Sequence, residues 1–448
     1  MSDLRSRAKK FFNALDFDTP INFGVEGLVE NSLSEELYVS SLHGKSDSDS
    51  VQQLADYIDF SASAGAYLFT GNRGTGKTTE LLRLAKILDG YGLEVFYVDM
   101  TEYLNLTQRV EISDFLISVL GAFSEKVGQR IGNEPGKKGF FERVWDFLQT
   151  DVKFTEFNIK GPVEFKAALN QNPTFKDKLQ IATRGHLEQL VKQGREFALE
   201  AVMQIRQKRG DKNRKVVLIV DSVERLRGVG DASDVREVFK SAETLFSSHS
   251  DKLRFTGLNV VYTVPPYLQA LAGSLGSSYA GGQIYALPNV HIYQGKPANG
   301  HRPAVSKPGL DKMLAIVAKR YPDWSDFFTE DQLSRLATSS GGDLRDYFRM
   351  MRLALTRTPA AVAELPVPDF FLADAENAVR NDMLPIADID REWLAKISLS
   401  HEPELPSLDE LPNFARLQQG KYLLNYRNGE SWYDVHPLLW EEVKAHGG

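Results

Sequence analysis

The stretch Gly71-Asn-Arg-Gly-Thr-Gly-Lys-Thr78 has the spacing G-x-x-x-x-G-K-T of a phosphate-binding loop. Its glycines allow the tight backbone turns that point N–H groups at a polyphosphate. Lys77 adds a positive charge for the terminal phosphates, and the Thr78 hydroxyl suits a Mg²⁺ ion. The residues expected to contact the nucleotide are Gly71, Asn72, Arg73, Gly74, Thr75, Gly76, Lys77, Thr78 and Thr79.

The sequence on either side of this loop supports the same interpretation. The apolar residues 66–70 predict a short strand before it, and residues 79–88 have the spacing of an amphipathic helix after it. The N-terminus of that helix would turn the positive end of its dipole toward the anion. A glycine-rich turn that matches the motif by chance would need neither neighbour. We therefore expect the chain to bind a nucleoside triphosphate.

The composition excludes several classes of protein. The 448 residues are 42% hydrophobic and 25% charged, which is ordinary for a soluble globular protein of two or three domains. The net charge of −7 provides no global positive field for nucleic acid. Without cysteine, the chain has neither disulfides nor thiolate metal sites. No secretion signal and no apolar run of roughly 18 residues is visible, so we expect a cytoplasmic protein.

The order of the predicted elements indicates an α/β fold with a parallel sheet, because strands alternate with helices. Strands are expected at residues 66–70, 94–98, 215–221, 259–264 and 289–293. The expected domains are an N-terminal helical preamble at 1–60, a nucleotide-binding core at 61–302, a helical lid at 303–372 and a winged-helix-like domain at 373–448.

Residues 133–213 interrupt the alternation of strands and helices as an insert in the core. Residues 152–166 roughly alternate around a Gly-Pro pair and predict a β-hairpin, and long helices follow at about 175–208. An interaction arm and an elaborated cover for the sheet both fit this pattern.

The last block predicts helices followed by a two-stranded wing. Residues 421–426 and 430–435 flank an Asn428-Gly429 turn and predict a hairpin. Its aromatic residues, which suit protein–protein contact, are Tyr422, Tyr426, Trp432 and Tyr433. From residue 375 onward the chain has 13 acidic and 7 basic residues, a net charge of −6. Binding to a phosphate backbone is driven mainly by basic residues, so this domain is a poor DNA reader.

Two acidic residues are candidates for completing the site. Asp221 ends an apolar strand, where an acid can hold Mg²⁺ through water beside the phosphate-binding loop. Glu224 could orient the water that attacks the nucleotide. The alternatives are an ordinary strand-end aspartate and a solvated glutamate at the start of a helix. Many ATPases place the catalytic acid directly after the metal-binding aspartate, where this chain has Ser222.

Three residues from other segments are further candidates. Arg345, in Gly341-Gly-Asp-Leu-Arg345, could reach the γ-phosphate from the lid, since guanidinium groups suit phosphate. Thr263 could report on the same phosphate from the end of its strand. Arg254 is a candidate arginine finger for a neighbouring subunit. For both arginines the alternative is an ordinary surface charge, and for Arg254 we favour that alternative.

The order of phosphate-binding loop, Asp221 strand, Thr263 strand, Arg345 helix and C-terminal wing resembles the AAA+ ATPases of the origin-recognition type and their relatives, the STAND signalling ATPases. The resemblance covers residues 35–448, with the insert outside it. It implies ATP and Mg²⁺ as cofactors and oligomers with sites between subunits. It also implies Lys77 and Thr78 on phosphate and metal, Asp221 on metal and Arg345 as a sensor. The departure at Ser222 favours a slow switch over fast turnover.

Three hypotheses about function remain. The first is an oligomerising ATPase switch that controls or scaffolds a partner effector, of the kind that bacteria use in signalling and phage defence. The second is a DNA-binding initiator or loader, which the wing suggests and the acidic charge of its domain disfavours. The third is a nucleotide-binding scaffold with little hydrolysis.

Overall fold

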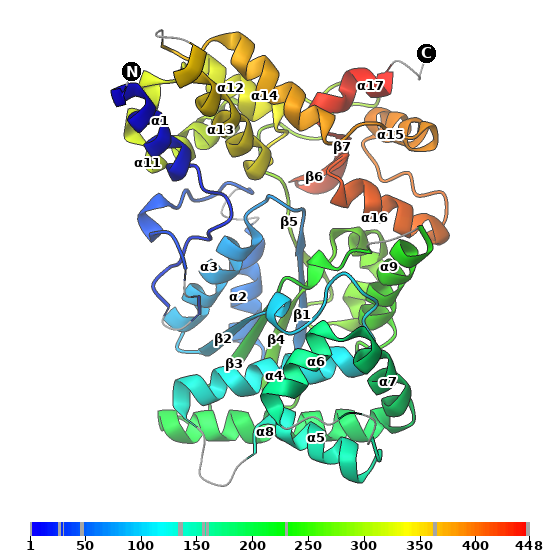
Figure 1. The fold of residues 1–448 in the computed structure, drawn as a ribbon. Coiled ribbons are helices and arrows are strands. Elements are labelled where there is room, and N and C mark those ends of the chain that lie inside the picture. The colour runs from blue at the N-terminus through cyan, green and yellow to red at the C-terminus, as the bar shows by residue number, and fades with distance from the viewer. Residues whose placement is uncertain are drawn as a thin grey trace.

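The chain folds around a parallel sheet, in the computed structural model described here (Figure 1). The structure describes residues 2–25, 28–29, 31–44, 49–132, 138–154, 157, 161–228, 232–361 and 365–444. The strands stand in the order β2-β3-β4-β1-β5, and every neighbouring pair is parallel. Their bounds are β1 Ala66–Gly71, β2 Glu94–Asp99, β3 Val216–Asp221, β4 Leu258–Val264 and β5 Ile284–Leu287. The predicted α/β fold class is confirmed.

Helices cover both faces of the sheet, which explains why its strands are almost continuous apolar runs. Alternate residues of a strand point to opposite faces. In β1, Leu68 therefore belongs to one hydrophobic core, whereas Tyr67 and Phe69 belong to the other. The face of Tyr67 is covered by α2 (Ser50–Phe60) and α3 (Lys77–Gly90). The face of Leu68 is covered by α4 (Ile112–Ile131), α8 (Leu187–Arg209) and α9 (Ala232–Ser247).

The strand expected at residues 289–293 is wrong. The place beside β1 is taken by β5, which ends just before this segment. The N–H group of Val290 donates to the carbonyl of Gly342 at 3.2 Å, and that of His291 donates to Leu42 at 3.1 Å. The N–H group of Asn289 donates to the carbonyl of Asn425 in the C-terminal hairpin at 2.8 Å. Residues 289–291 are thus bonded to the hairpin, the lid and the preamble rather than to the parallel sheet, and alternation alone does not reveal that difference.

The hairpin expected in the insert is also wrong where the structure describes it. Residues 163–166 lie in a helix that starts at Pro162, a residue whose fixed φ suits the first turn. Residues 155–156 and 158–160 lie outside the described residues. The insert helices lie at the far end of the molecule from the lid (Figure 1). They are α5 (Phe140–Thr150), α6 (Pro162–Gln171), α7 (Pro173–Thr183) and α8.

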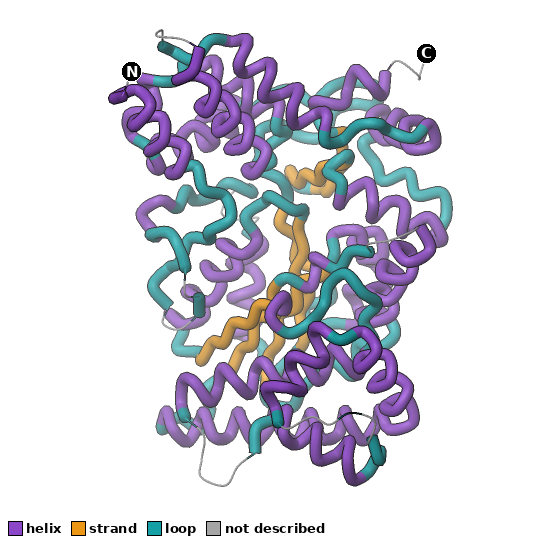
Figure 2. Tube along the Cα trace, viewed as in Figure 1, coloured by secondary structure: helices purple, strands orange, loops and turns teal. Residues whose placement is uncertain are grey.

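The first helix of the preamble packs with the lid, although some 300 residues separate them in sequence. The ring of Phe11 in α1 (Ser2–Ala14) stacks on Tyr321, with centroids 4.4 Å apart. Figure 2 shows that this end of the molecule is almost entirely helical. The lid helices are α11 (Lys307–Arg320), α12 (Glu330–Ser339) and α13 (Leu344–Ala361). None of the helices in the described ranges is long and apolar enough to cross a bilayer.

The predicted C-terminal hairpin is confirmed as β6 (Leu423–Asn428) paired with β7 (Glu430–Val435). The aromatic docking surface expected on it is wrong for Tyr426, Trp432 and Tyr433, which are buried. Tyr426 stacks on Trp432 at 4.5 Å, so these rings form a core instead of a surface. The surrounding helices are α14 (Asp369–Asn381), α15 (Asp388–Ser400), α16 (Leu411–Gln419) and α17 (Trp440–Lys444). The winged-helix assignment of residues 373–448 stays a prediction.

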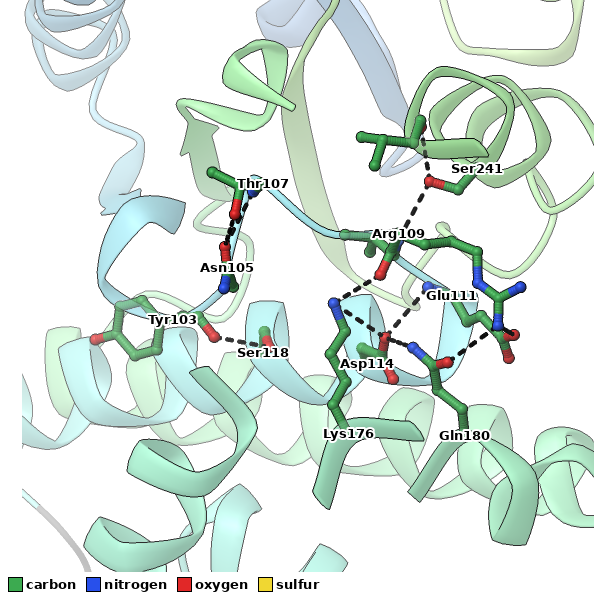
Figure 3. Close-up of polar contacts among 12 residues, drawn as sticks. Tyr103, Asn105, Thr107, Arg109, Glu111, Asp114, Ser118, Lys176, Gln180 and Ser241 are labelled. Atoms are coloured by element: carbon green, nitrogen blue, oxygen red, sulfur yellow. Dashed lines mark hydrogen bonds and ion pairs between the residues drawn. The ribbon is translucent and has the colours of Figure 1, made fainter. Parts of the chain in front are cut away.

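A buried polar network attaches the insert to the core (Figure 3). The Lys176 ammonium of α7 donates to the carbonyl of Arg109 at 2.7 Å and lies 3.8 Å from the carboxylate of Asp114 in α4. The Gln180 amide donates to the same carboxylate at 2.5 Å. Burial raises the pKa of Asp114 to about 6, despite the opposing charge of Lys176. Both charged groups are thus held out of water, and each depends on the other.

We expect Lys176→Met to destabilise the fold in a pH-dependent way. At pH 8 the loss should reach about 3–5 kcal/mol, because the Asp114 carboxylate is left buried without a counter-charge. The pKa of Asp114 lies above its ordinary value of 3.8, so the folded state favours the protonated acid, and stability falls as pH rises through about 6. The loss should therefore shrink at pH 5. Urea denaturation at both pH values measures it, with the exposed Lys178→Met as control. Equal losses at both pH values would contradict this account.

Candidate functional site

The phosphate-binding loop lies between β1 and α3 and has the backbone conformation that its glycines predict. Gly74 and Gly76 have φ angles of 92° and 84°, in the left-handed region where other residues are strained. The Lys77 ammonium is nearly buried and donates to the carbonyl of Asn72 at 3.0 Å, and the hydroxyl of Thr75 donates to the same carbonyl at 2.9 Å. The loop is therefore folded around its lysine, with that cation held at the centre.

The residues predicted to hold Mg²⁺ lie together. The hydroxyl of Thr78 donates to the carboxylate of Asp221 at 2.9 Å, and the buried hydroxyl of Tyr97 donates to the same oxygen at 2.6 Å. Burial, followed by the charge of Glu224, raises the pKa of Asp221 to about 6. Oxygen donors with uncompensated negative charge fit a hard cation such as Mg²⁺, which would keep water and phosphate oxygens as its other ligands. Among the described residues, no group of three or more acidic or histidine side chains forms a metal site by itself.

Glu224 faces the lysine of the loop. Its carboxylate lies 3.4 Å from the Lys77 ammonium, and the two side chains are only 10% and 7% exposed. The other carboxylate oxygen, Oε2, is buried and has no hydrogen-bond partner in the described part of the chain. An unpartnered acceptor beside the lysine of the phosphate-binding loop is placed to accept a hydrogen bond from a water molecule. The structure thus brings Glu224 into the site, and its catalytic role stays a prediction.

Thr263 lies next to the 3₁₀ turn Val223–Arg225, which carries Glu224. Its hydroxyl accepts a hydrogen bond from the N–H of Val223 at 3.1 Å and donates to the carbonyl of Val220 at 3.3 Å. Ser222, between them, has a φ of 70°. The side chain of Thr263 therefore orients the turn that carries Glu224, and it is absent from the residues that line the nearby cavity.

A cavity of ≈ 1030 Å³ opens beside the loop. This volume is at the upper end for a small-molecule site. Its lining includes Arg73, Gly74, Lys77, Thr78 and Glu224. Thr79 also lines it, and the Thr79 hydroxyl accepts a hydrogen bond from the N–H of Ile21 at 3.2 Å, which holds the preamble over the loop.

The preamble supplies an apolar wall that the sequence analysis missed. The lining residues from this segment include Phe17, Pro20, Ile21, Leu37, Val39 and Leu42. An apolar wall next to a phosphate-binding loop is the environment that a nucleobase needs. These residues follow neither a helical nor a strand period, so the pattern carries no signal. The only hint was a set of apolar residues in an otherwise polar connection.

The two candidate arginines differ in position. Arg345 lines the cavity, and its guanidinium donates to exposed Asp18 at 2.8 Å and lies 4.9 Å from the ring centre of Phe17. The preceding residue of the lid contacts the loop directly, because the N–H of Leu344 donates to the carbonyl of Gly74 at 3.2 Å. Arg254 donates to the carbonyl of Ser278 and does not line the cavity. The structure brings Arg345 to the site and leaves Arg254 outside it.

Comparison with known proteins gives no basis for assigning a family or an activity to this chain. No protein-family model and no curated protein matches the chain. Similar solved structures include a Walker-type ATPase of Pyrococcus abyssi, with 12% identity over 96% of this chain and 99% of that chain and a TM-score of 0.38. Cdc6p of Pyrobaculum aerophilum has 14% identity over 92% of this chain and 96% of that chain, with a TM-score of 0.35. A RuvB variant of Thermotoga maritima has 12% identity over 92% and 99%, with a TM-score of 0.37.

These values carry no inference about the activity of this chain. The assignment of the loop as a phosphate-binding loop depends instead on its own position, since it follows β1 of a parallel sheet and precedes α3. That placement is the structural context that the motif requires. The chain has the α/β fold of a P-loop nucleotide-binding protein.

Proposed function

We propose that this protein is a Mg²⁺-dependent ATPase switch of the AAA+ type, in which the C-terminal domain responds to the nucleotide. The observation that supports a switch is that the P-loop contacts the lid directly and is joined to the C-terminal hairpin through the side chains of Asn289 and Asp343. A nucleotide that reshapes the loop would then alter its contacts with two other domains, and a ligand shifts an equilibrium by its differential interaction with the two states.

One line of contact runs through Asn289. Its side-chain oxygen accepts a hydrogen bond from the amide of Asn72 in the P-loop at 3.1 Å. The same oxygen accepts a bond from the N–H of Asn425 in β6 at 3.3 Å, and the N–H of Asn289 donates to the carbonyl of Asn425 at 2.8 Å. A single buried side chain therefore joins the P-loop to the C-terminal hairpin.

A second line runs through Asp343 at the start of the lid helix α13. A Cβ atom on Gly74 would lie only 2.4 Å from the Asp343 carboxylate, so the loop and this acid are in close contact. The Lys421 ammonium, next to β6, lies 2.9 Å from Asp343 and 3.0 Å from Asp346. His436, just after β7, lies 3.6 Å from Asp346. This buried charge cluster ties the loop, the lid and the hairpin into one unit.

The catalytic part of the proposal is a slow hydrolysis. Lys77 would neutralise the phosphates, Asp221 and Thr78 would hold the ion, and Glu224 would orient the attacking water. Arg345 would sense the γ-phosphate from the lid after leaving Asp18. Because Ser222 occupies the place of the usual second acid, Glu224 acts from a 3₁₀ turn instead of the strand end.

The partners of the switch follow from charge and from the resemblance to AAA+ and STAND proteins. We propose homo-oligomers that control a protein effector, in bacterial signalling or defence against phage. The net charge of −6 after residue 374 disfavours duplex DNA as the partner, since binding to DNA is driven mainly by basic residues that neutralise phosphates and release their counterions.

Lys77→Ala should abolish measurable ATP binding, because the loop loses its only central cation. Isothermal titration calorimetry measures the affinity, and a thermal melt shows that the variant is folded. Lys86→Ala, an exposed lysine on the same helix α3, is the matched control. ATP binding that survives Lys77→Ala in a folded protein would refute the proposed nucleotide site.

Glu224→Gln should bind ATP with near-normal affinity but slow its turnover by roughly 10²–10⁴-fold, the usual effect of losing a positioned acid or base. Phosphate release under single-turnover conditions measures it. Turnover at the wild-type rate would assign the base to another residue.

Asn289→Ala should preserve ATP binding and break its link to the C-terminal hairpin. In the unmodified protein, ATP should slow hydrogen exchange in β6 and change the oligomeric mass, and a coupling of about 1–3 kcal/mol corresponds to roughly 5–150-fold. The variant should lose most of both responses. Hydrogen exchange and native mass spectrometry with and without ATP measure them, with the exposed Lys396→Met of α15 as control. An unchanged ATP response in the variant would remove Asn289 from the proposed switch.

A further inference from the structure

Positive charge gathers beside the P-loop in excess of what the motif needs. Arg73, Arg225 and Arg227 line the same cavity as Lys77, together with Arg345 of the lid. Burial, followed by the charges of Arg345, Arg227 and Arg225, lowers the pKa of Arg73. The guanidinium group of Arg73 is therefore close enough to the other three arginines to be repelled by their charges.

The three arginines of the core differ from the other cations of the cavity. Arg345 pairs with Asp18, and Arg416 pairs with Asp390. In contrast, no ion pair or side-chain hydrogen bond among the described residues involves the guanidinium groups of Arg73, Arg225 or Arg227. The charge of Asp343 acts on Arg73 without forming an ion pair with it, and all three arginines are exposed. Exposed cations that lie side by side repel one another through charges that solvent screens, and an anion that joins them relieves this repulsion. We name Arg73, Arg225 and Arg227 the arginine cluster.

The backbone that carries this cluster is anchored at the catalytic edge of the sheet. Arg225 follows Glu224 in the 3₁₀ turn Val223–Arg225, whose first N–H is held by Thr263. The N–H of Arg227 donates to the carbonyl of Leu106 at 2.9 Å. One backbone bond therefore holds the start of the turn and another holds the chain just after it, so Arg225 and Arg227 project from a defined backbone next to Glu224. Arg73 joins them from the P-loop itself.

We propose that the arginine cluster forms a site for the γ-phosphate of a nucleoside triphosphate within one chain, so that each subunit supplies its own arginine clamp. The proposal rests on the ATP binding proposed above and deepens it. Guanidinium groups fit phosphate oxygens in a bidentate way and stay charged, which makes them the suited residues for this task. The cluster would distinguish ATP from ADP, because only the triphosphate places an anion beyond the β-phosphate.

The position of Arg254 is consistent with a clamp of this kind. This candidate finger is held by the carbonyl of Ser278 and lies outside the cavity lining. The charges that face the nucleotide already come from the same chain as Lys77. Completion of the site by an arginine of a neighbouring subunit is then not required for γ-phosphate recognition.

The first test compares affinities for ATP and ADP in the double variant Arg225→Ala/Arg227→Ala. Calorimetry should show ATP affinity reduced by about 10–100-fold, the effect of losing charged hydrogen bonds, and ADP affinity within about twofold of the unmodified protein. Arg236→Ala, an exposed arginine of α9 outside the cavity lining, is the matched control and should leave both affinities unchanged. Equal losses for ATP and ADP, or no loss for either, would overturn the proposal. Arg73 is left intact because it belongs to the P-loop.

The second test separates a clamp within one chain from a finger between chains. The double variant is mixed with Lys77→Ala chains, which keep all their arginines but should not bind ATP. A clamp within one chain predicts that mixing leaves ATP affinity and turnover of the double variant as they were. Restored affinity or turnover in the mixture would assign the arginines to a neighbouring subunit and overturn the proposal. Normal ADP binding in the double variant keeps either result distinct from a failure of the nucleotide site itself.

Discussion

A hydrogen bond of 2.9 Å joins the hydroxyl of Thr78 to the carboxylate of Asp221, across 143 residues of sequence. Thr78 follows β1, and Asp221 is the last residue of β3. The two strands are not neighbours, since β4 lies between them. The bond forms only because all the strands run in the same direction, so that their carboxyl ends meet at one edge. Each feature of the site depends on that edge, including the turn with Glu224 and the buried carboxylate of Asp221 that a cation would compensate.

The elements of this edge were predictable because each has a strong local signal. The glycines of the P-loop identify one half of the site, and the apolar run that ends at Asp221 identifies the other. Four of the five expected strands are present within a residue or two of their expected bounds. Buried parallel strands are continuous apolar runs, and such runs stand out from the helices around them.

The predictions from the sequence failed where tertiary contacts decide the conformation. Residues 163–166 alternate like a strand, but Phe165 packs against the insert as part of a helix, with its ring 5.7 Å from that of Phe175. The prediction of the hairpin was correct for β6 and β7, yet its rings pack into a core that includes Tyr293, a residue from before the lid. The apolar wall that the preamble forms beside the cavity was also missed, because irregular backbone that folds over a site has no sequence period to detect.

Gly74 carries two independent constraints. The nucleotide motif needs a glycine there for its left-handed backbone, and the lid needs one because the Asp343 carboxylate occupies the space of a side chain. A larger residue would strain the loop and also act as a wedge that pushes α13 and, through Lys421, the hairpin away from the core. Mutational tolerance at this position is therefore set by the contact between domains as well as by phosphate chemistry. If the P-loop alone were scanned with alanine or proline, the loss caused by the disturbed lid contact would be mistaken for a loss of nucleotide binding.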